Sequence, residues 1–201
     1  MTDVPTYHLR VAEEADVESV LALRRHAEQW LRDAGIEQWT KSEYGAGVMK
    51  GWIGAGSTFV VQTDDGDIIG SLSLDAGDAD FWTPEELSEP ARYLYKFILR
   101  SDHRGNGLGD VLLDWASYRT ESTGDLYLRL DCWRDNTGLH NYYLRRGFQY
   151  IDTRPHPIRM SGALFERSAE LRLAQSAPLR LIDGNLGHQF HPVPGVPRSQ
   201  G

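Results

Sequence analysis

The chain has 201 residues, of which 40% are hydrophobic and 25% charged, and its formal net charge is -8 with a pI near 5.3. This acidic balance argues against a nucleic-acid partner, because binding to phosphate backbones draws on clustered lysine and arginine. No apolar run approaches the roughly 20 residues needed to cross a bilayer, and no signal-peptide pattern begins the chain. The single cysteine, Cys132, excludes an internal disulfide. We therefore expect a cytoplasmic protein without a membrane partner.

The N-terminal third predicts a strand, two helices and a hairpin. Residues 7–11 alternate between apolar and polar, which is typical of a strand. Asp16 is the expected N-cap of a helix that ends at Gly35. The apolar stripe of this helix is formed by Val17, Val20, Leu21, Arg24, Ala27 and Leu31. A weaker helix is expected over 42–52, because each of its three glycines costs about 1 kcal/mol relative to alanine. Two strand-like runs, 58–63 and 67–74, flank an Asp-Asp-Gly turn and predict a β-hairpin.

The remaining chain continues to alternate between strands and helices. An acidic loop from 75 to about 90 leads to an apolar strand over 93–99, a glycine-rich loop and a helix. A strand over 126–133, a helix around Tyr143 and two closing strands over 148–153 and 158–165 follow. Beyond residue 166 the periodicity ends. Two helical turns are conceivable over 168–175, but scattered prolines and glycines predict an irregular C-terminal extension over 167–201.

The glycine-rich loop is the most informative segment. It reads Arg104-Gly105-Asn106-Gly107-Leu108-Gly109 and joins the 93–99 strand to the N-terminus of a helix. Glycines let the backbone approach a ligand closely, and the free N–H groups and dipole of a helix N-terminus favour an anion. A Rossmann fingerprint would need glycine in place of Asp110, and a Walker A loop would need lysine followed by serine or threonine. The remaining interpretations are a pyrophosphate-binding loop of another kind and a loop without a binding role.

Two motifs resemble the GCN5-related N-acetyltransferases. The loop is similar to their motif A, R/Q-x-x-G-x-G/A, through Arg104, Gly107 and Gly109. In the family's second signature an asparagine begins a helix and a tyrosine follows seven positions later; Asn136 and Tyr143 match it, and Gly-Phe at 147–148 closes the pattern. The resemblance covers about residues 6–166. It implies a GNAT domain over 1–166 with an α+β fold, whose mixed, mostly antiparallel sheet is flanked by helices and splayed between its fourth and fifth strands.

The same resemblance implies acetyl-CoA as co-substrate. The backbone of the glycine loop would bind its pyrophosphate, and Ile98 and Leu99 would pair with the pantetheine arm. Asn136 would help to hold the cofactor, although capping the helix alone is an alternative. The loop residues that we expect to bind are Arg104, Gly105, Asn106, Gly107, Leu108 and Gly109.

Tyr143 is the expected general acid, since a phenol with a reference pKa of about 10 is protonated at neutral pH and can protonate the departing thiolate. A packed aromatic side chain is the alternative role. The general base is harder to find, because no carboxylate lies between 92 and 99; Asp75 and Asp131 are candidates, and each could instead be structural or solvated. Cys132 shares a strand face with leucines, which indicates a small buried side chain. The seven histidines form no metal-ligand pattern, so we expect no metal.

The acceptor site is expected in the first two helices and the loop after the third strand. Trp30, Trp39, Phe81 and Trp82, with nearby carboxylates, could hold a cationic amine by stacking and cation–π contacts, although ordinary core residues would look similar. We expect acetyl transfer to the primary amine of a small molecule by direct attack in a ternary complex. The oligomeric state is left open, with a homodimer as one possibility. The alternatives are a carrier-protein phosphopantetheine donor and a catalytically silent CoA-binding module.

Overall fold

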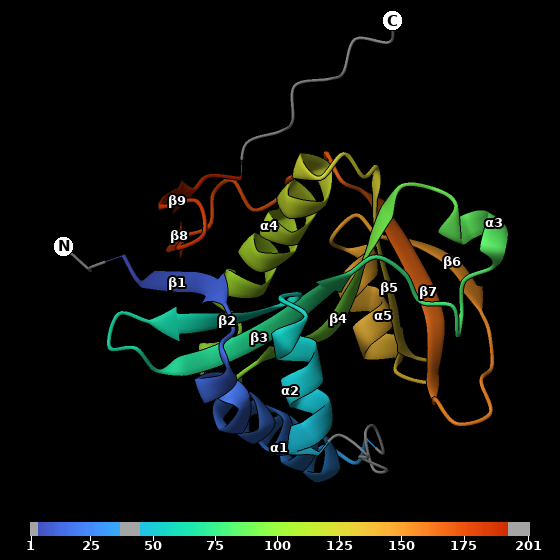
Figure 1. Cartoon of the computed structure of the whole chain (residues 1–201), viewed down its shortest axis with the longest axis horizontal. Helices are drawn as coiled ribbons and strands as arrows, with labels where there is room; N and C mark the ends of the chain where they lie inside the picture. The colour runs from blue at the N-terminus through green and yellow to red at the C-terminus, as the bar shows by residue number, and fades with distance from the viewer. Residues whose placement is uncertain (1–3, 37–44, 193–201) are drawn as a thin grey trace, which may run out of the picture.

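The computed structural model describes residues 4–36 and 45–192, and these residues build one mixed sheet with helices on both faces (Figure 1). The described strands run in the order β6-β7-β5-β4-β3-β2-β1-β8-β9. Among them, β4 with β5 and β1 with β8 are parallel, and the other pairings are antiparallel. The α+β class and the mostly antiparallel sheet are therefore confirmed. The strands are β1 (Thr6–Val11), β2 (Thr58–Thr63), β3 (Ile68–Asp75), β4 (Ala91–Leu99), β5 (Tyr127–Trp133), β6 (Gln149–Thr153), β7 (Ser161–Ser168), β8 (Arg180–Asp183) and β9 (His188–Phe190).

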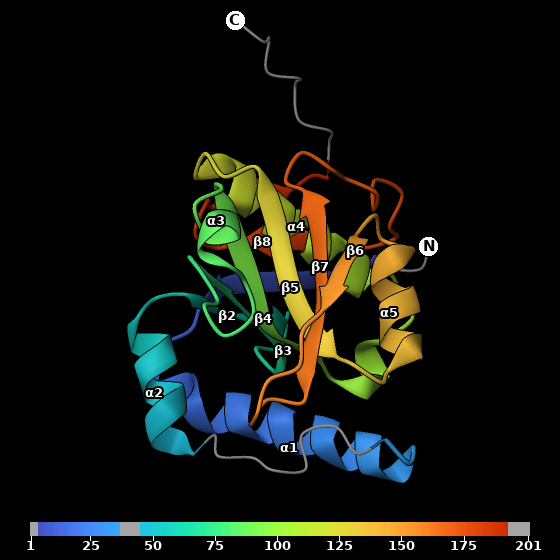
Figure 2. The ribbon, with the colours of Figure 1, turned by 90° about the vertical axis from the view of Figure 1, so that its right-hand side faces the viewer.

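The helices divide between two faces of the sheet. They are α1 (Val17–Asp33), α2 (Ala46–Gly54), the short α3 (Pro84–Leu87), α4 (Leu108–Ser122) and α5 (Thr137–Leu144), with 3₁₀ turns η1 (Glu14–Asp16) and η2 (Ser101–His103). Helices α4 and α5 contribute Trp115 and Tyr143 to the largest core cluster. Helices α1 and α2 together bury a second cluster that includes Val20 and Met49, and α1 also packs Ala27 against Ile98 of β4. Figure 2 shows α1 running along one side of the sheet, with α2 beside it and α5 next to β6.

Helix α1 has the expected apolar stripe and begins directly after Asp16, as expected. All six predicted stripe residues are buried, and Gly35 after the helix has a φ of 70°. Asp16 occupies the predicted N-cap position, but its side chain makes no capping hydrogen bond to the helix. Its carboxylate instead accepts the Glu13 N–H at 2.7 Å and pairs with Arg10, because the turn η1 precedes the helix. Helix α2 is described from Ala46; the earlier part of the predicted 42–52 helix, and Trp39, lie outside the described residues.

Strand β4 is irregular just before the glycine loop. Ile98 pairs with Ser71 of β3 and Tyr95 with Ser73, so Lys96 and Phe97 together oppose a single β3 residue and form a β-bulge. On the other side, the pairing with β5 covers Ala91–Leu94, although both strands continue beyond it. The pairing therefore stops at the boundary where the resemblance predicts a splay.

The prediction of an irregular C-terminal extension is wrong in its central part. No helix is found at 168–175, but β8 and β9 form a hairpin, and β8 pairs in parallel with β1 (Figure 1). Leu181 and Phe190 join the main core, and the buried Asp183 carboxylate accepts a hydrogen bond from Trp115 Nε1 at 2.6 Å. These strands have four and three residues, too few for a periodic pattern to be visible in the sequence.

Candidate active site

The glycine loop presents unpaired backbone donors at the start of α4. Gly105 and Gly107 have φ angles of 81° and 89°, a left-handed region that glycine adopts without steric cost. The N–H groups of Gly105, Asn106, Gly107 and Gly109 have no hydrogen-bond acceptor within the described part of the chain. These donors lie together at the positive end of a helix of 15 residues. Such an arrangement fits a phosphate or diphosphate group.

Asn106 and Leu108 have internal roles in this loop. The Asn106 side chain donates from Nδ2 to the Tyr7 hydroxyl at 2.9 Å, and its Oδ1 accepts the Leu108 N–H at 3.0 Å. The Leu108 amide is therefore already satisfied, and its side chain is fully buried. Among the backbone N–H groups predicted to bind the pyrophosphate, that of Leu108 is already hydrogen-bonded within the protein.

The Arg104 side chain binds the last backbone carbonyl of β4. Its Nε and Nη2 donate to the Leu99 carbonyl at 3.0 and 2.9 Å, and its guanidinium lies 4.5 Å from the centre of the Trp30 ring. In an antiparallel ladder successive residues face opposite sides. Because the Arg100 N–H bonds to Ile69 of β3, the Leu99 carbonyl faces away from β3. By the same alternation the Ile98 backbone faces β3, so Leu99 is the better placed of the two predicted pantetheine partners.

Tyr143 lies in the core and keeps its proton. Its side chain is 7% exposed, and its ring contacts those of Phe148 and Phe165 at centroid distances of 5.3 and 5.9 Å. Burial raises the pKa of Tyr143 well above the ordinary value for a phenol. Asn136 Oδ1 caps α5 by accepting the Leu139 N–H at 2.9 Å. The packing role of Tyr143 is thus present, and its hydroxyl is protonated at neutral pH.

The two carboxylates predicted as bases lie in different surroundings. Asp75 is exposed at the end of β3, where its Oδ1 accepts the Ala76 N–H at 2.7 Å. The Asp131 side chain is buried and accepts a hydrogen bond from Arg159 Nη2 at 3.1 Å, and its pKa is raised because burial outweighs the arginine. The same arginine binds Asp78 at 2.9 Å. Asp131 is therefore part of an ion-pair cluster beside the end of the β4–β5 pairing.

Residues 23–148 match the family model described as Acetyltransferase (GNAT) family. The chain belongs to the GNAT family. It is 30% identical over 141 residues, 68% of this chain and 78% of the relative, to the uncharacterized N-acetyltransferase YesJ of Bacillus subtilis. A GNAT-family acetyltransferase from Listeria monocytogenes has a similar fold, with a TM-score of 0.64 and 19% identity over 81% of this chain and 94% of its own. PaiA N-acetyltransferase from Thermoplasma acidophilum, solved in complex with coenzyme A, gives a TM-score of 0.63 and 18% identity over 81% of this chain and 98% of its own.

The aromatic residues predicted for the acceptor site of this GNAT domain do not form one wall. Phe81 and Trp82 are 4% and 3% exposed and pack in a small cluster with Tyr93 and Leu164. Trp30 is instead 43% exposed and stacks with Arg104 at the glycine loop. The sequence pattern could not distinguish aromatic side chains that are buried in the core from those that are accessible at the surface.

Two residues near the GNAT motifs were missed in the sequence. The Tyr142 ring stacks under the Arg146 guanidinium at 3.5 Å, and its hydroxyl lies next to Gly109. Burial raises the pKa of Tyr142 to about 12. Lys96 is the second; a lone lysine in the apolar run 93–99 is the signal that could have found it.

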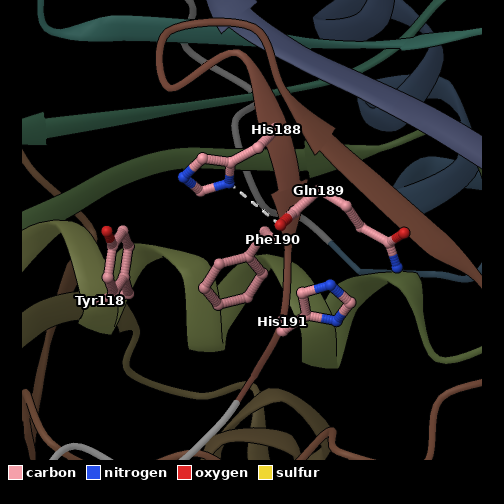
Figure 3. Close-up of a pocket in the computed structure, with 5 residues that line it drawn as sticks. All are labelled: Tyr118, His188, Gln189, Phe190 and His191. Atoms are coloured by element: carbon pink, nitrogen blue, oxygen red, sulfur yellow. Dashed lines mark hydrogen bonds between the residues drawn. The ribbon is translucent and has the colours of Figure 1, made fainter.

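Other features of the described residues lie apart from this site. A pocket at the C-terminal hairpin is lined by Tyr118, His188, Gln189, Phe190 and His191, none of them a predicted site residue (Figure 3). Within 4–36 and 45–192 no group of three or more histidine, cysteine or acidic side chains could hold a metal ion. No helix in these ranges is both long and apolar enough to span a bilayer.

Proposed function

We propose that the protein transfers an acetyl group from acetyl-CoA to the primary amine of a small molecule, by direct attack in a ternary complex. The observation that carries this proposal is the set of backbone donors at Gly105, Asn106, Gly107 and Gly109, which have no acceptor among the described residues. A diphosphate would satisfy them at a helix N-terminus. The coenzyme A complex of the Thermoplasma relative supports a CoA donor for this fold.

The end of β4 supports the second half of donor binding. The Leu99 carbonyl faces away from β3 and has two donors from Arg104. A pantetheine amide could replace Arg104 at this carbonyl, and the released guanidinium would then be near the anionic diphosphate. Acetyl-CoA would supply the thioester, and the chain would supply its orientation.

Tyr143 is the proposed proton donor to the departing sulfur. The pKa of Tyr143 is raised by burial, so the hydroxyl holds its proton throughout the physiological range. The carboxylates are weaker candidates for the proton acceptor. Asp131 is bound by Arg159, and Asp75 is exposed and bonded to its own backbone.

The charge around Arg159 supports a cationic acceptor. Asp78, Asp80 and Asp131 all bind this one arginine, at 2.9, 2.9 and 3.1 Å, so the cluster is negative when the three are ionised. An ammonium group approaching the end of the β4–β5 pairing would be attracted by it.

Two alternatives make different demands on the glycine loop and Tyr143. A carrier-protein donor has no adenosine diphosphate, so it would leave the free amides of the loop without a function. A silent CoA-binding module would not need a protonated phenol at Tyr143. The loop geometry therefore favours free CoA, and Tyr143 favours catalysis.

Thiol release tests this function directly. The full chain is mixed with acetyl-CoA and a panel of amines that includes amino acid amides, alkylamines, polyamines and aminoglycosides, and each rate is compared with the amine-free rate. We expect amine-dependent thiol release and an acetylated amine in the product mixture. Binding of acetyl-CoA without amine-dependent release across this panel would contradict the proposed transfer to small amines.

A further inference from the structure

Lys96 occupies a strained position beside the proposed donor site. It lies in the β4 bulge, two residues after Leu94, the last residue paired with β5, and three residues before Leu99. Its φ is 48°, and no other non-glycine residue in 4–36 or 45–192 has a positive φ. A non-glycine residue held in such a backbone conformation costs about 1–3 kcal/mol of strain, and such residues are concentrated at functional sites.

The surroundings of Lys96 favour its neutral form. Its side chain packs against the indole ring of Trp52 from α2, next to Tyr95, whose ring also contacts Trp52. Burial, helped by Arg24 of α1 and Arg159 before β7 and opposed by Asp75 of β3, lowers the pKa of Lys96 to about 6. At neutral pH most of the Lys96 amine is therefore unprotonated and able to accept a proton.

Lys96 and Tyr143 approach the same boundary from opposite faces of the sheet. Tyr143 belongs to the core shared by α4 and α5, whereas Lys96 contacts α2. Asp131, at the end of β5, acts electrostatically on Tyr143 and pairs with Arg159, which in turn acts on Lys96. The two groups are thus linked through one charged cluster at the end of the β4–β5 pairing.

We propose that Lys96 is the base that removes a proton from the acceptor ammonium before transfer. This inference rests on the proposed acetyl transfer. Lys96 Nζ takes one proton, which leaves a neutral amine. That amine forms a C–N bond to the carbonyl carbon as the C–S bond breaks. Tyr143 donates its proton to the departing sulfur and regains one from the new amide nitrogen, and Lys96 then releases its proton to solvent, so one proton leaves per turnover.

A lysine base of this kind selects a class of acceptor. Proton transfer to Lys96 is least unfavourable when the acceptor is itself weakly basic. An α-amino group has an ordinary pKa of about 7.7–8.0, against about 10.4 for an alkylamine such as the lysine side chain. We therefore expect α-amino groups of amino acid derivatives or short peptides to be better acceptors than polyamines and simple alkylamines.

Steady-state kinetics of Lys96→Met test the role of the amine. In the parent, kcat should rise with pH through an apparent pKa of about 6. In Lys96→Met, kcat should fall by about 100-fold or more, and its remaining pH dependence should follow the pKa of the bound acceptor. Lys50→Met is the matched control, because Lys50 is exposed on α2 and pairs with Glu14; it should behave as the parent.

Chemical rescue separates catalysis from folding. Lys96→Cys, alkylated with 2-bromoethylamine, regains an amine at nearly the same position, and the chain's other cysteine, Cys132, is buried. The rescued variant should recover most of the lost kcat with unchanged acetyl-CoA affinity. A rescued variant that binds acetyl-CoA normally but stays as slow as Lys96→Met would overturn the proposal.

Nuclear magnetic resonance gives a readout that needs no turnover. The chain has three lysines, Lys41, Lys50 and Lys96, so ¹³Cε signals can be assigned by difference from Lys96→Met. The Lys96 signal should titrate near pH 6 in the free protein. Titration near pH 10, or a Lys96→Met variant with parental kcat and pH profile, would refute a lysine base. A parent without amine-dependent thiol release would instead refute the underlying acetyl transfer, whatever the titration shows.

Discussion

The Tyr142 hydroxyl lies 2.6 Å from the position that a Cβ atom at Gly109 would occupy. This contact joins α5 to the first turn of α4, and the Arg146 guanidinium, which pairs with Asp110 of that turn, holds the Tyr142 ring from its other side. A side chain at the third glycine of the loop would therefore clash with a neighbouring side chain. The two sequence motifs are in direct contact at this point.

Gly109→Ala should weaken acetyl-CoA binding. The added methyl group must displace the Tyr142 hydroxyl, and overpacking of this kind costs about 1–3 kcal/mol. Since about 1.4 kcal/mol corresponds to a tenfold change in affinity, we expect a loss of about tenfold or more by calorimetry. Gly51→Ala in α2 is the control, because a Cβ there has open space; it should leave affinity unchanged and stabilise the helix by about 1 kcal/mol. Parental affinity in Gly109→Ala would show that Tyr142 yields without consequence for the loop.

Tyr143→Phe should reduce turnover while acetyl-CoA affinity stays within about twofold of the parent. General acids contribute about 10²–10⁴-fold to rate, so a fall in kcat of about 100-fold is expected. An acid works below its pKa, and burial raises that of Tyr143, so the parent should show no loss of kcat from this group up to about pH 10. Tyr150→Phe, which removes an exposed hydroxyl bonded to Thr153, is the control. Equal kcat in Tyr143→Phe and the parent would limit Tyr143 to packing.

Glu86→Gln should lower stability in a pH-dependent way. Arg154 lowers the pKa of Glu86 from 4.5 to about 2, so its stabilisation is present above pH 4.5 and is lost as the pH falls toward 2. The pair is partly solvated, so we expect about 1–2 kcal/mol at pH 7, less than the full shift would give. Urea unfolding of parent and variant should converge near pH 2. A difference that does not change with pH would show that the charge of Glu86 is not the cause; Glu85→Gln, on the same short helix, is the control.

Asp183→Ala should destabilise the whole domain rather than a free tail. The Asp183 carboxylate is fully buried and binds Trp115 Nε1 and the backbone N–H of Asn185. Leaving these donors unpaired costs about 1–3 kcal/mol each in a buried site, so a loss of about 3 kcal/mol is expected by urea unfolding. Asp65→Ala in the exposed β2–β3 turn should change stability by less than about 0.5 kcal/mol. An unchanged midpoint in Asp183→Ala would mean that the hairpin does not stabilise the domain.

The sequence predicted elements whose signal is local. The stripe of α1, the Asp-Asp-Gly hairpin turn and the Asn136 cap each depend on residues a few positions apart, and all three are found. Apolar periodicity predicted the alternation of strands and helices up to residue 165, and the structure confirms this order, adding the short helix α3. The functions of Tyr143, Asn136 and the glycine loop remain predictions that the proposed experiments test.

What the sequence could not predict depends on contacts between distant segments. Asp16 binds Arg10 and Glu13 instead of capping α1, and Asp183 anchors a hairpin to Trp115, 68 residues earlier. The bulge that turns Lys96 toward α2 is a register shift between β3 and β4, which no pattern within β4 records. Phe81 and Trp82 were expected at a pocket wall, but the cluster around Tyr93 buries them.

The central claim is that the free amides of residues 105–109 bind the diphosphate of an acyl-CoA. Calorimetric titration of the full chain with acetyl-CoA, in parallel with S-acetylpantetheine, tests it most directly, because the second ligand has the thioester arm but no diphosphate. We predict that S-acetylpantetheine binds about 100-fold more weakly, a difference of about 2.7 kcal/mol. Equal affinity for the two ligands would contradict the role assigned to the glycine loop and favour a carrier-protein donor.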